Sequence, residues 1–170
     1  MQQGTIKAIA ACAAFTIAGV IGFVFFSHTN ETFLLVGYYA VIVLNTFFSI
    51  RAFAPITPKN VSQALFDAVL VLIYIALALS FRSIIQFSVV SWGLFVFANF
   101  KYMHLEALVP QQKEFLQHKM RINWLGAFLS AIAFALALLG FPLLAAWSLF
   151  VIFAIAQFYL LIIDPMYQMR

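Results

Sequence analysis

Charged residues are scarce in this sequence. They make up 8% of its 170 residues, whereas hydrophobic residues make up 66% and the mean hydropathy is +1.07. A soluble domain carries about 25% charged residues, so the chain cannot hide its apolar groups within one water-soluble globule. The sequence has only one cysteine, Cys12, which excludes a disulfide framework and a multi-thiolate metal site within one chain. We therefore expect an integral membrane protein.

The motifs of several enzyme classes are missing as well. There is no glycine-rich phosphate loop, no Gly-x-Ser-x-Gly elbow and no His-Glu-x-x-His motif. Histidines and carboxylates do gather in one polar stretch, at His104, Glu106, Glu114 and His118, but the lysines beside them oppose a bound cation. The sequence therefore predicts no cofactor, no metal and no enzymatic activity. The alternative is an intramembrane lipid-modifying enzyme that uses His104, Glu106 or His118.

Long apolar runs dominate the rest of the chain. A membrane-spanning helix needs about 20 mostly apolar residues, and six segments meet or approach this length: 6–26, 33–54, 61–81, 84–102, 124–140 and 143–163. Short connections at 27–32, 82–83 and 141–142 pair these segments as three helical hairpins. The sequence predicts an all-α fold, a bundle of six transmembrane helices that forms a single domain over residues 1–170.

The basic residues indicate how this bundle is oriented. Eight of the nine fall on one side of the predicted topology: Lys7, Arg51, Lys59, Lys101, Lys113, Lys119, Arg121 and Arg170. Only Arg82 falls on the other side. Because basic residues concentrate in cytoplasmic loops, we expect both termini in the cytoplasm and the protein in a cytoplasmic membrane of bacterial type. The net charge of +4 then follows from topology and does not indicate nucleic-acid binding.

The only long polar segment is the predicted cytoplasmic connector, residues 103–123. Its second half, Gln111–Ile122, reads as a short amphipathic helix with Phe115, Leu116 and Met120 against lipid. Three basic side chains on that segment are then expected to contact anionic lipid headgroups; they are Lys113, Lys119 and Arg121.

Small residues recur at every fourth position in two of the predicted helices. The first helix carries Ala10, Ala14, Ala18 and Gly22, and the fifth carries Ala127, Ala131 and Ala135. Spacing by four places each set on one helical face, and small residues allow membrane helices to approach closely. We expect these faces to pack inside the bundle. The alternative is a docking face for another subunit.

A few polar side chains lie within the apolar segments. The fourth segment has a stripe of Ser88, Ser91, Trp92, Phe95, Asn99 and Tyr102, the second has Tyr38, Asn45 and Ser49, and the sixth has Gln157. A few polar groups among aromatic side chains are typical of a solute-binding pocket. The alternative is that each amide makes a hydrogen bond between helices.

Asp67 is the one carboxylate inside a predicted span. A carboxylate near hydrocarbon needs a partner or a proton. Arg51 and Lys101 lie at a similar depth, so an ion pair with one of them is expected. The alternative is that Asp67 couples proton or ion movement to transport.

These features favour a transporter or channel for a small solute or ion. Its polar path would contain Asp67, Asn45, Asn99, Gln157, Tyr38 and Ser91. The alternative is a non-catalytic accessory or assembly subunit that binds a membrane protein partner, forms a homo-oligomer or binds lipid.

Overall fold

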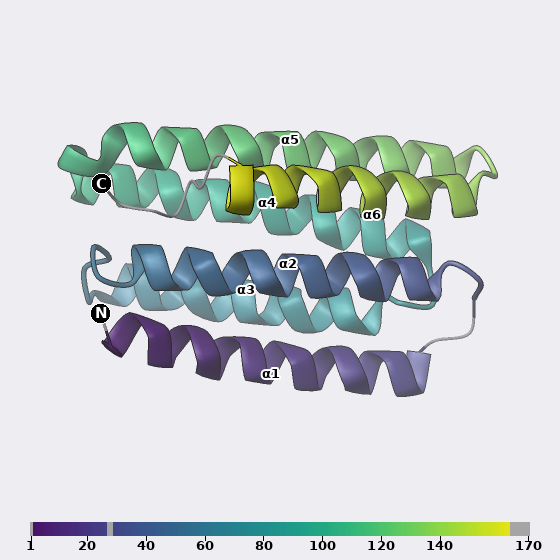
Figure 1. The fold of residues 1–170 in the computed structure, drawn as a ribbon, viewed down its shortest axis with the longest axis horizontal. Coiled ribbons are helices and arrows are strands. Elements are labelled where there is room, and N and C mark those ends of the chain that lie inside the picture. The colour runs from purple at the N-terminus through teal and green to yellow at the C-terminus, as the bar shows by residue number, and fades with distance from the viewer. Residues whose placement is uncertain (1, 27–28, 164–170) are drawn as a thin grey trace.

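Six long helices lie side by side in a computed structural model that describes residues 2–26 and 29–163 (Figure 1). They are α1 (Gln2–Phe26), α2 (Thr32–Phe53), α3 (Val61–Leu79), α4 (Ile84–Leu108), α5 (Lys113–Leu138) and α6 (Pro142–Phe158). A 3-10 turn, η1 (Pro110–Gln112), precedes α5, and a π-helical turn, η2 (Tyr159–Ile163), follows α6. Each long helix of the described residues is long and apolar enough to cross a membrane. The predicted all-α bundle of six candidate spans is confirmed, and Arg170 lies outside the described residues.

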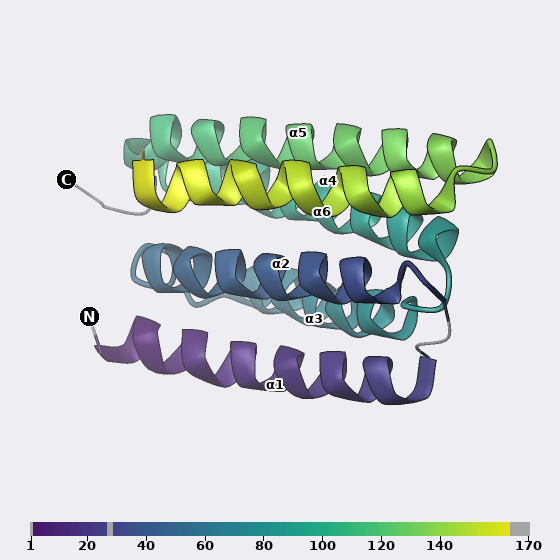
Figure 2. The same ribbon diagram turned by 45° about the vertical axis from the view of Figure 1, so that its right-hand side comes forward.

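The helices form two groups of three that pack against each other (Figures 1 and 2). Within the first group α1 contacts both α2 and α3, and within the second α5 lies against both α4 and α6. The groups meet where α2 contacts α6 and where α3 contacts α4. The backbones of α2 and α3 lie further apart, and these two helices meet through long side chains, such as those of Tyr39 and Tyr74. We call the end of the bundle at which α1 begins the lysine end and the opposite one the Arg82 end.

Local sequence explains why the hairpin turns are short. Asn60 caps α3 by accepting a hydrogen bond of 2.8 Å from the backbone N–H of Gln63, and Ser83 caps α4 in the same way through Gln86. Gly140 ends α5 with a φ of +88°, a conformation that favours glycine. The N–H groups of Gly140 and Phe141 then bond back to the last turn of α5. These caps end one helix and start the next, so that the chain reverses direction within a few residues.

The structure differs from the expected connector over residues 103–123. α4 continues to Leu108 and α5 begins at Lys113, so the two helices form one long hairpin and no separate interfacial helix lies between them. Leu116 is fully buried in a small core with Leu105 and Val109, against the expectation that it faces lipid. The physical reason is that helical apolar spacing continues through both segments, and Pro110 interrupts it only at the turn.

Leu116→Ala is expected to lower the free energy of unfolding by about 3 kcal/mol, because it leaves a cavity in this small core. The matched control is Leu125→Ala on the same helix, where the leucine is 69% exposed. Unfolding in mixed detergent micelles measures both. If both substitutions lower the free energy of unfolding by the same small amount, Leu116 faces lipid and the buried position is contradicted.

The small-residue faces pack over part of their length. At the Arg82 end α1 crosses α3 so closely that a Cβ on Gly22 would lie 2.3 Å from the carbonyl oxygen of Ala78. Toward the lysine end, however, Ala10 and Ala14 are exposed. The buried face of α5 is also turned from the expected one, because Ala131 and Ala135 are exposed. The buried residues on this part of α5 are Gly126, Ala127, Ser130, Ala133 and Ala137. The small-residue face of α1 therefore packs closely at Gly22, near the Arg82 end, and faces outward at Ala10 and Ala14.

Gly22→Ala is expected to destabilise the protein by about 2 kcal/mol, because the new methyl group must displace the backbone of α3. Gly93→Ala is the control, since a Cβ there meets no described atom within 4 Å. That substitution should instead gain up to about 1 kcal/mol of helix propensity. Thermal unfolding in detergent compares the two, and an unchanged melting temperature for Gly22→Ala would contradict the close crossing.

Candidate functional site

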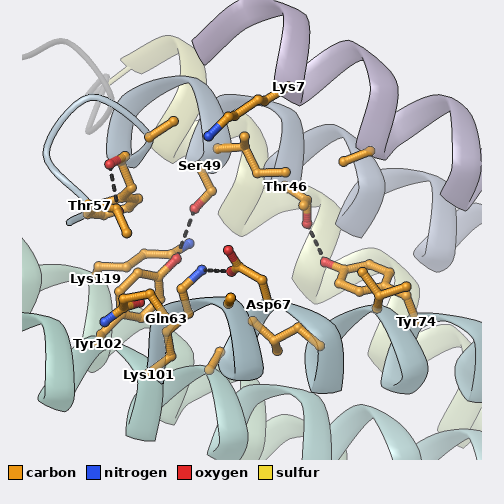
Figure 3. Close-up of a pocket in the computed structure, with 18 of the residues that line it drawn as sticks. Lys7, Thr46, Ser49, Thr57, Gln63, Asp67, Tyr74, Lys101, Tyr102 and Lys119 are labelled. Carbon is orange, nitrogen blue, oxygen red and sulfur yellow. Dashed lines mark hydrogen bonds and ion pairs between the residues drawn. The ribbon is translucent and has the colours of Figure 1, made fainter. Parts of the chain in front are cut away.

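A cavity of about 710 Å³ occupies the space between the helices at the lysine end (Figure 3). Side chains of α1 to α5 and of the loop between α2 and α3 line it. Its volume lies in the range of about 300–1,000 Å³ that is typical of small-molecule sites. At the mouth Lys59 and Asn60 are exposed, whereas Phe15, Leu94 and Phe95 at the inner end are buried. The cavity therefore runs from the surface of the lysine end into the bundle.

Asp67 and Lys101 meet within this cavity. The Lys101 Nζ lies 2.5 Å from Asp67 Oδ1, and the Asp67 side chain is 58% exposed. At a rise of about 1.5 Å per residue, Asp67 lies about 9 Å along α3 from Val61. Arg51, the other expected partner, is exposed and does not line the cavity. Lys101 reaches Asp67 because α4 packs against α3, whereas the Arg51 side chain is exposed outside the cavity.

Lys119 is buried in the cavity wall, against the expectation that it contacts lipid headgroups. Its exposed fraction is 3%, and it lines the cavity together with Tyr102 and Ser49, whose hydroxyl groups are 3.3 Å apart. The reason is helical phase, since Leu116, Lys119 and Asn123 share the buried face of α5. The other two expected headgroup contacts are exposed: Lys113, whose Nζ is 3.9 Å from Glu106, and Arg121.

The cavity is strongly cationic. Among the described residues its lining contains four lysines, Lys7, Lys59, Lys101 and Lys119, and a single carboxylate, that of Asp67. Figure 3 shows Lys7, Lys101 and Lys119 approaching the cavity from three different helices. Neither Lys7 nor Lys59 has a carboxylate within 4 Å in the part of the chain that the structure describes. Within the described residues, the lining therefore carries more ammonium groups than carboxylates.

Gln63 adds an amide without a partner. The residue is 2% exposed, and neither its side-chain nitrogen nor its side-chain oxygen has a hydrogen-bond partner among the described residues. Its backbone N–H donates to Asn60 Oδ1 in the cap of α3. A buried polar group without a partner costs about 1–3 kcal/mol, so such groups in a cavity wall indicate a place where a ligand or water completes the bonding.

The inner end of the cavity is aromatic. The rings of Phe15 and Tyr74 are stacked with centroids 4.2 Å apart, and the Tyr74 hydroxyl hydrogen-bonds to Thr46. Leu94 and Phe95 complete this end. The cavity thus combines charged groups toward its mouth with an apolar inner end.

Beyond this end a chain of hydroxyl groups links three helices. The Tyr38 Oη lies 2.6 Å from Ser91 Oγ, which lies 2.9 Å from Ser130 Oγ. The Tyr38 ring also contacts Phe87 and Phe153, with ring centroids 5.5 and 4.8 Å apart. We call these five side chains the seal, because they are buried between the cavity and the Arg82 end.

Ser88 lies one turn further along α4, toward the Arg82 end. Its hydroxyl is fully buried and has no hydrogen-bond partner among the described residues. The half of the bundle at the Arg82 end therefore contains a buried hydroxyl group, that of Ser88, without a hydrogen-bond partner among the described residues.

The remaining expected path residues separate into two groups. Asn45 lines the cavity. Asn99 does not; with its amide oriented to suit its neighbours, it donates to the Met120 carbonyl at 3.3 Å and accepts from Trp124 Nε1 at 3.2 Å, between α4 and α5. Gln157 is buried on α6 away from the cavity, and Trp92, expected in the α4 stripe, is exposed.

The side chains considered for lipid chemistry do not converge. The His104 ring lies 5.5 Å from that of Phe66 on α3, Glu106 accepts a 2.9 Å hydrogen bond from Gln117 on α5, and His118 is exposed. Within residues 2–26 and 29–163 no group of three His, Cys, Asp or Glu side chains is placed to hold a metal ion.

The cavity residues that sequence reasoning missed carry a helical signal. Gln63, Asp67, Leu70 and Tyr74 follow the i, i+4, i+7, i+11 spacing of one face of α3, and all four line the cavity. Once Asp67 is taken as a cavity residue, this spacing identifies Gln63 as another, because it lies one turn earlier on the same face. Lys119 was missed because residues 103–123 were expected to lie outside the bundle.

Comparison of the chain with protein-family models, curated proteins and solved structures gives no match. The six apolar helices of the described residues are those of a polytopic membrane protein. Function must therefore be argued from the cavity.

Proposed function

We propose that this protein is a transporter that binds a small solute in the cavity and carries it across the membrane. The observation that supports this proposal best is a cavity of about 710 Å³, with charged groups toward its mouth, that begins at one end of the bundle and stops at the seal about halfway along it. A transporter in the state open to one side has this shape.

The composition of the seal also favours transport. A permanent structural core in lipid is packed most simply from apolar side chains, since each polar group there needs a partner. Here the barrier contains three hydroxyl groups from α2, α4 and α5, and the unpartnered Ser88 hydroxyl lies one turn from Ser91 toward the Arg82 end, next to Phe87 of the seal. In the state open to the Arg82 end, water or solute would satisfy Ser88 while the cavity at the lysine end closes.

Cysteine accessibility tests this proposal without knowledge of the solute. In a Cys12→Ala background, Ala64→Cys in the cavity wall should react with a charged, membrane-impermeant thiol reagent applied from the lysine end. Ser88→Cys should react with the same reagent only from the Arg82 end, more slowly, because that state is the less populated one.

Ser148→Cys on α6 is the matched control for Ser88→Cys, since its hydroxyl bonds to the Ala145 carbonyl within its own helix and it does not line the cavity. It is expected to react no faster from the Arg82 end than a protein without cysteine. A Ser88→Cys protein that stays inert from the Arg82 end, while Ala64→Cys reacts from the lysine end, would contradict transport and leave a closed binding pocket.

A further inference from the structure

We propose that the ligand of the cavity is an organic anion, a molecule with a phosphate or carboxylate head and an apolar body. This inference names the substrate class of the proposed transporter and rests on that function for its biological meaning. The residues of the cavity support it, and the binding of small anions to the protein tests it.

The head group is indicated by charge and burial together. Lys119 and Lys101 hold ammonium groups where little water reaches, and Lys7 approaches the same cavity from α1 (Figure 3). Charge-assisted hydrogen bonds to phosphate or carboxylate are about twice as strong as neutral ones, and their strength rises as water is excluded. Among the described residues of the lining, a cationic ligand would meet a single carboxylate, that of Asp67.

Gln63 supplies the second, independent observation. Its buried side-chain amide has two N–H donors and no partner among the described residues. Asp67, on the same face of α3, is already held by Lys101. An anion seated beside Gln63 and the lysines would give the amide the acceptor that the protein leaves out.

The apolar body follows from the inner end and the volume. Phe15, Tyr74, Leu94 and Phe95 provide aromatic and aliphatic walls, and an inorganic ion would leave most of the roughly 710 Å³ unfilled. Both a soluble organic anion and an anionic lipid headgroup carry this chemistry. An experiment must therefore separate these two sources.

The ion pair of Asp67 and Lys101 defines how the anion enters. The Asp67 carboxylate, 2.5 Å from the Lys101 ammonium group, stands where the carboxylate or phosphate of a ligand would stand. An arriving anion competes with Asp67 for Lys101 and releases it. The exchange replaces one charge-assisted hydrogen bond of Lys101 with another, and no covalent bond is made or broken.

Calorimetric titration of the protein in phosphatidylcholine nanodiscs tests the inference, with phenyl phosphate and phenyltrimethylammonium as probes that share a ring and differ in charge. Phenyl phosphate is expected to bind at least tenfold more tightly. Lys119→Gln should weaken its binding about tenfold, since one charge-assisted hydrogen bond is lost. Lys7→Gln should weaken it about threefold, and it provides a variant at an exposed position if Lys119→Gln folds poorly.

Arg121→Gln is the matched control, because this cation lies two residues from Lys119 but is exposed and outside the cavity. The inference is overturned if phenyl phosphate binds no more tightly than phenyltrimethylammonium, or if Lys7→Gln and Lys119→Gln weaken binding no more than Arg121→Gln does. In either case the accessibility of Ser88→Cys would still report on transport, so the two proposals fail separately.

A second set of nanodiscs that contain phosphatidylglycerol distinguishes the two sources of anion. If phosphatidylglycerol weakens phenyl phosphate binding to the wild type and not to Lys119→Gln, the lipid headgroup occupies the cavity. If binding is unchanged, the ligand is a soluble anion. Both results support an anion site, provided that the lysine variants behave as expected.

Discussion

Asp67→Asn is expected to tighten the binding of phenyl phosphate about tenfold. The carboxylate competes with the ligand for Lys101, and the substitution removes both this competitor and the repulsion between two negative charges in one cavity. An ion pair with this degree of exposure contributes at most about 1 kcal/mol, and the lost repulsion adds to it; about 1.4 kcal/mol corresponds to a tenfold change. Titration in phosphatidylcholine nanodiscs measures the effect.

The sign of this change separates two roles for Asp67. If Asp67 is a coupling carboxylate that binds a proton or a cation, its loss should leave phenyl phosphate binding unchanged or abolish it through misfolding. Glu106→Gln is the control, because that carboxylate bonds to Gln117 outside the cavity. Weaker or unchanged binding in a folded Asp67→Asn protein would contradict competition for Lys101.

Ala98→Trp is expected to abolish phenyl phosphate binding, a loss of at least about 100-fold. Ala98 is half-buried and lines the cavity on α4, between Phe95 and Tyr102. The indole ring of the new tryptophan would occupy the cavity without adding charge. Because protein interiors pack closely, the ligand and the indole ring cannot occupy the same space. Because the cavity already exists, the substitution should cost little stability.

The control for this prediction is Ala107→Trp, at an exposed position of the same helix outside the cavity. Both variants should unfold near the wild-type temperature, but only Ala98→Trp should lose binding. Retained binding in Ala98→Trp would mean that phenyl phosphate binds elsewhere on the protein.

The sequence predicted where the helices lie along the chain better than it predicted which helices contact each other. Length and hydropathy alone identify six spans, because a lipid environment allows few alternatives to the helix. They do not determine which helices are neighbours, and so Arg51 and Lys101 were equally suitable partners for Asp67. The arrangement that brings Lys101 to Asp67 depends on contact between α3 and α4, a property of the whole bundle.

The cavity itself was predicted only in part. Asn45 and Asp67 were expected to lie along a polar path, and the structure brings both into the cavity wall, but Asn99 lies between α4 and α5. Lys119 was assigned to lipid headgroups because a polar segment of basic residues usually lies at the membrane surface. The helical spacing that buries Lys119 belongs to α5, in which Leu116, Lys119 and Asn123 share one face, and it becomes visible only when α5 is extended back to Lys113.

Counterflow in proteoliposomes tests the central claim most directly. Vesicles that contain the protein are loaded with unlabelled phenyl phosphate and diluted into a trace of the labelled compound. The account predicts that label accumulates transiently above its equilibrium level in wild-type vesicles, because exchange through a binding site outruns net loss, and that Ala98→Trp vesicles show no accumulation. Wild-type uptake no faster than that of Ala98→Trp vesicles, with phenyl phosphate bound normally in nanodiscs, would contradict transport.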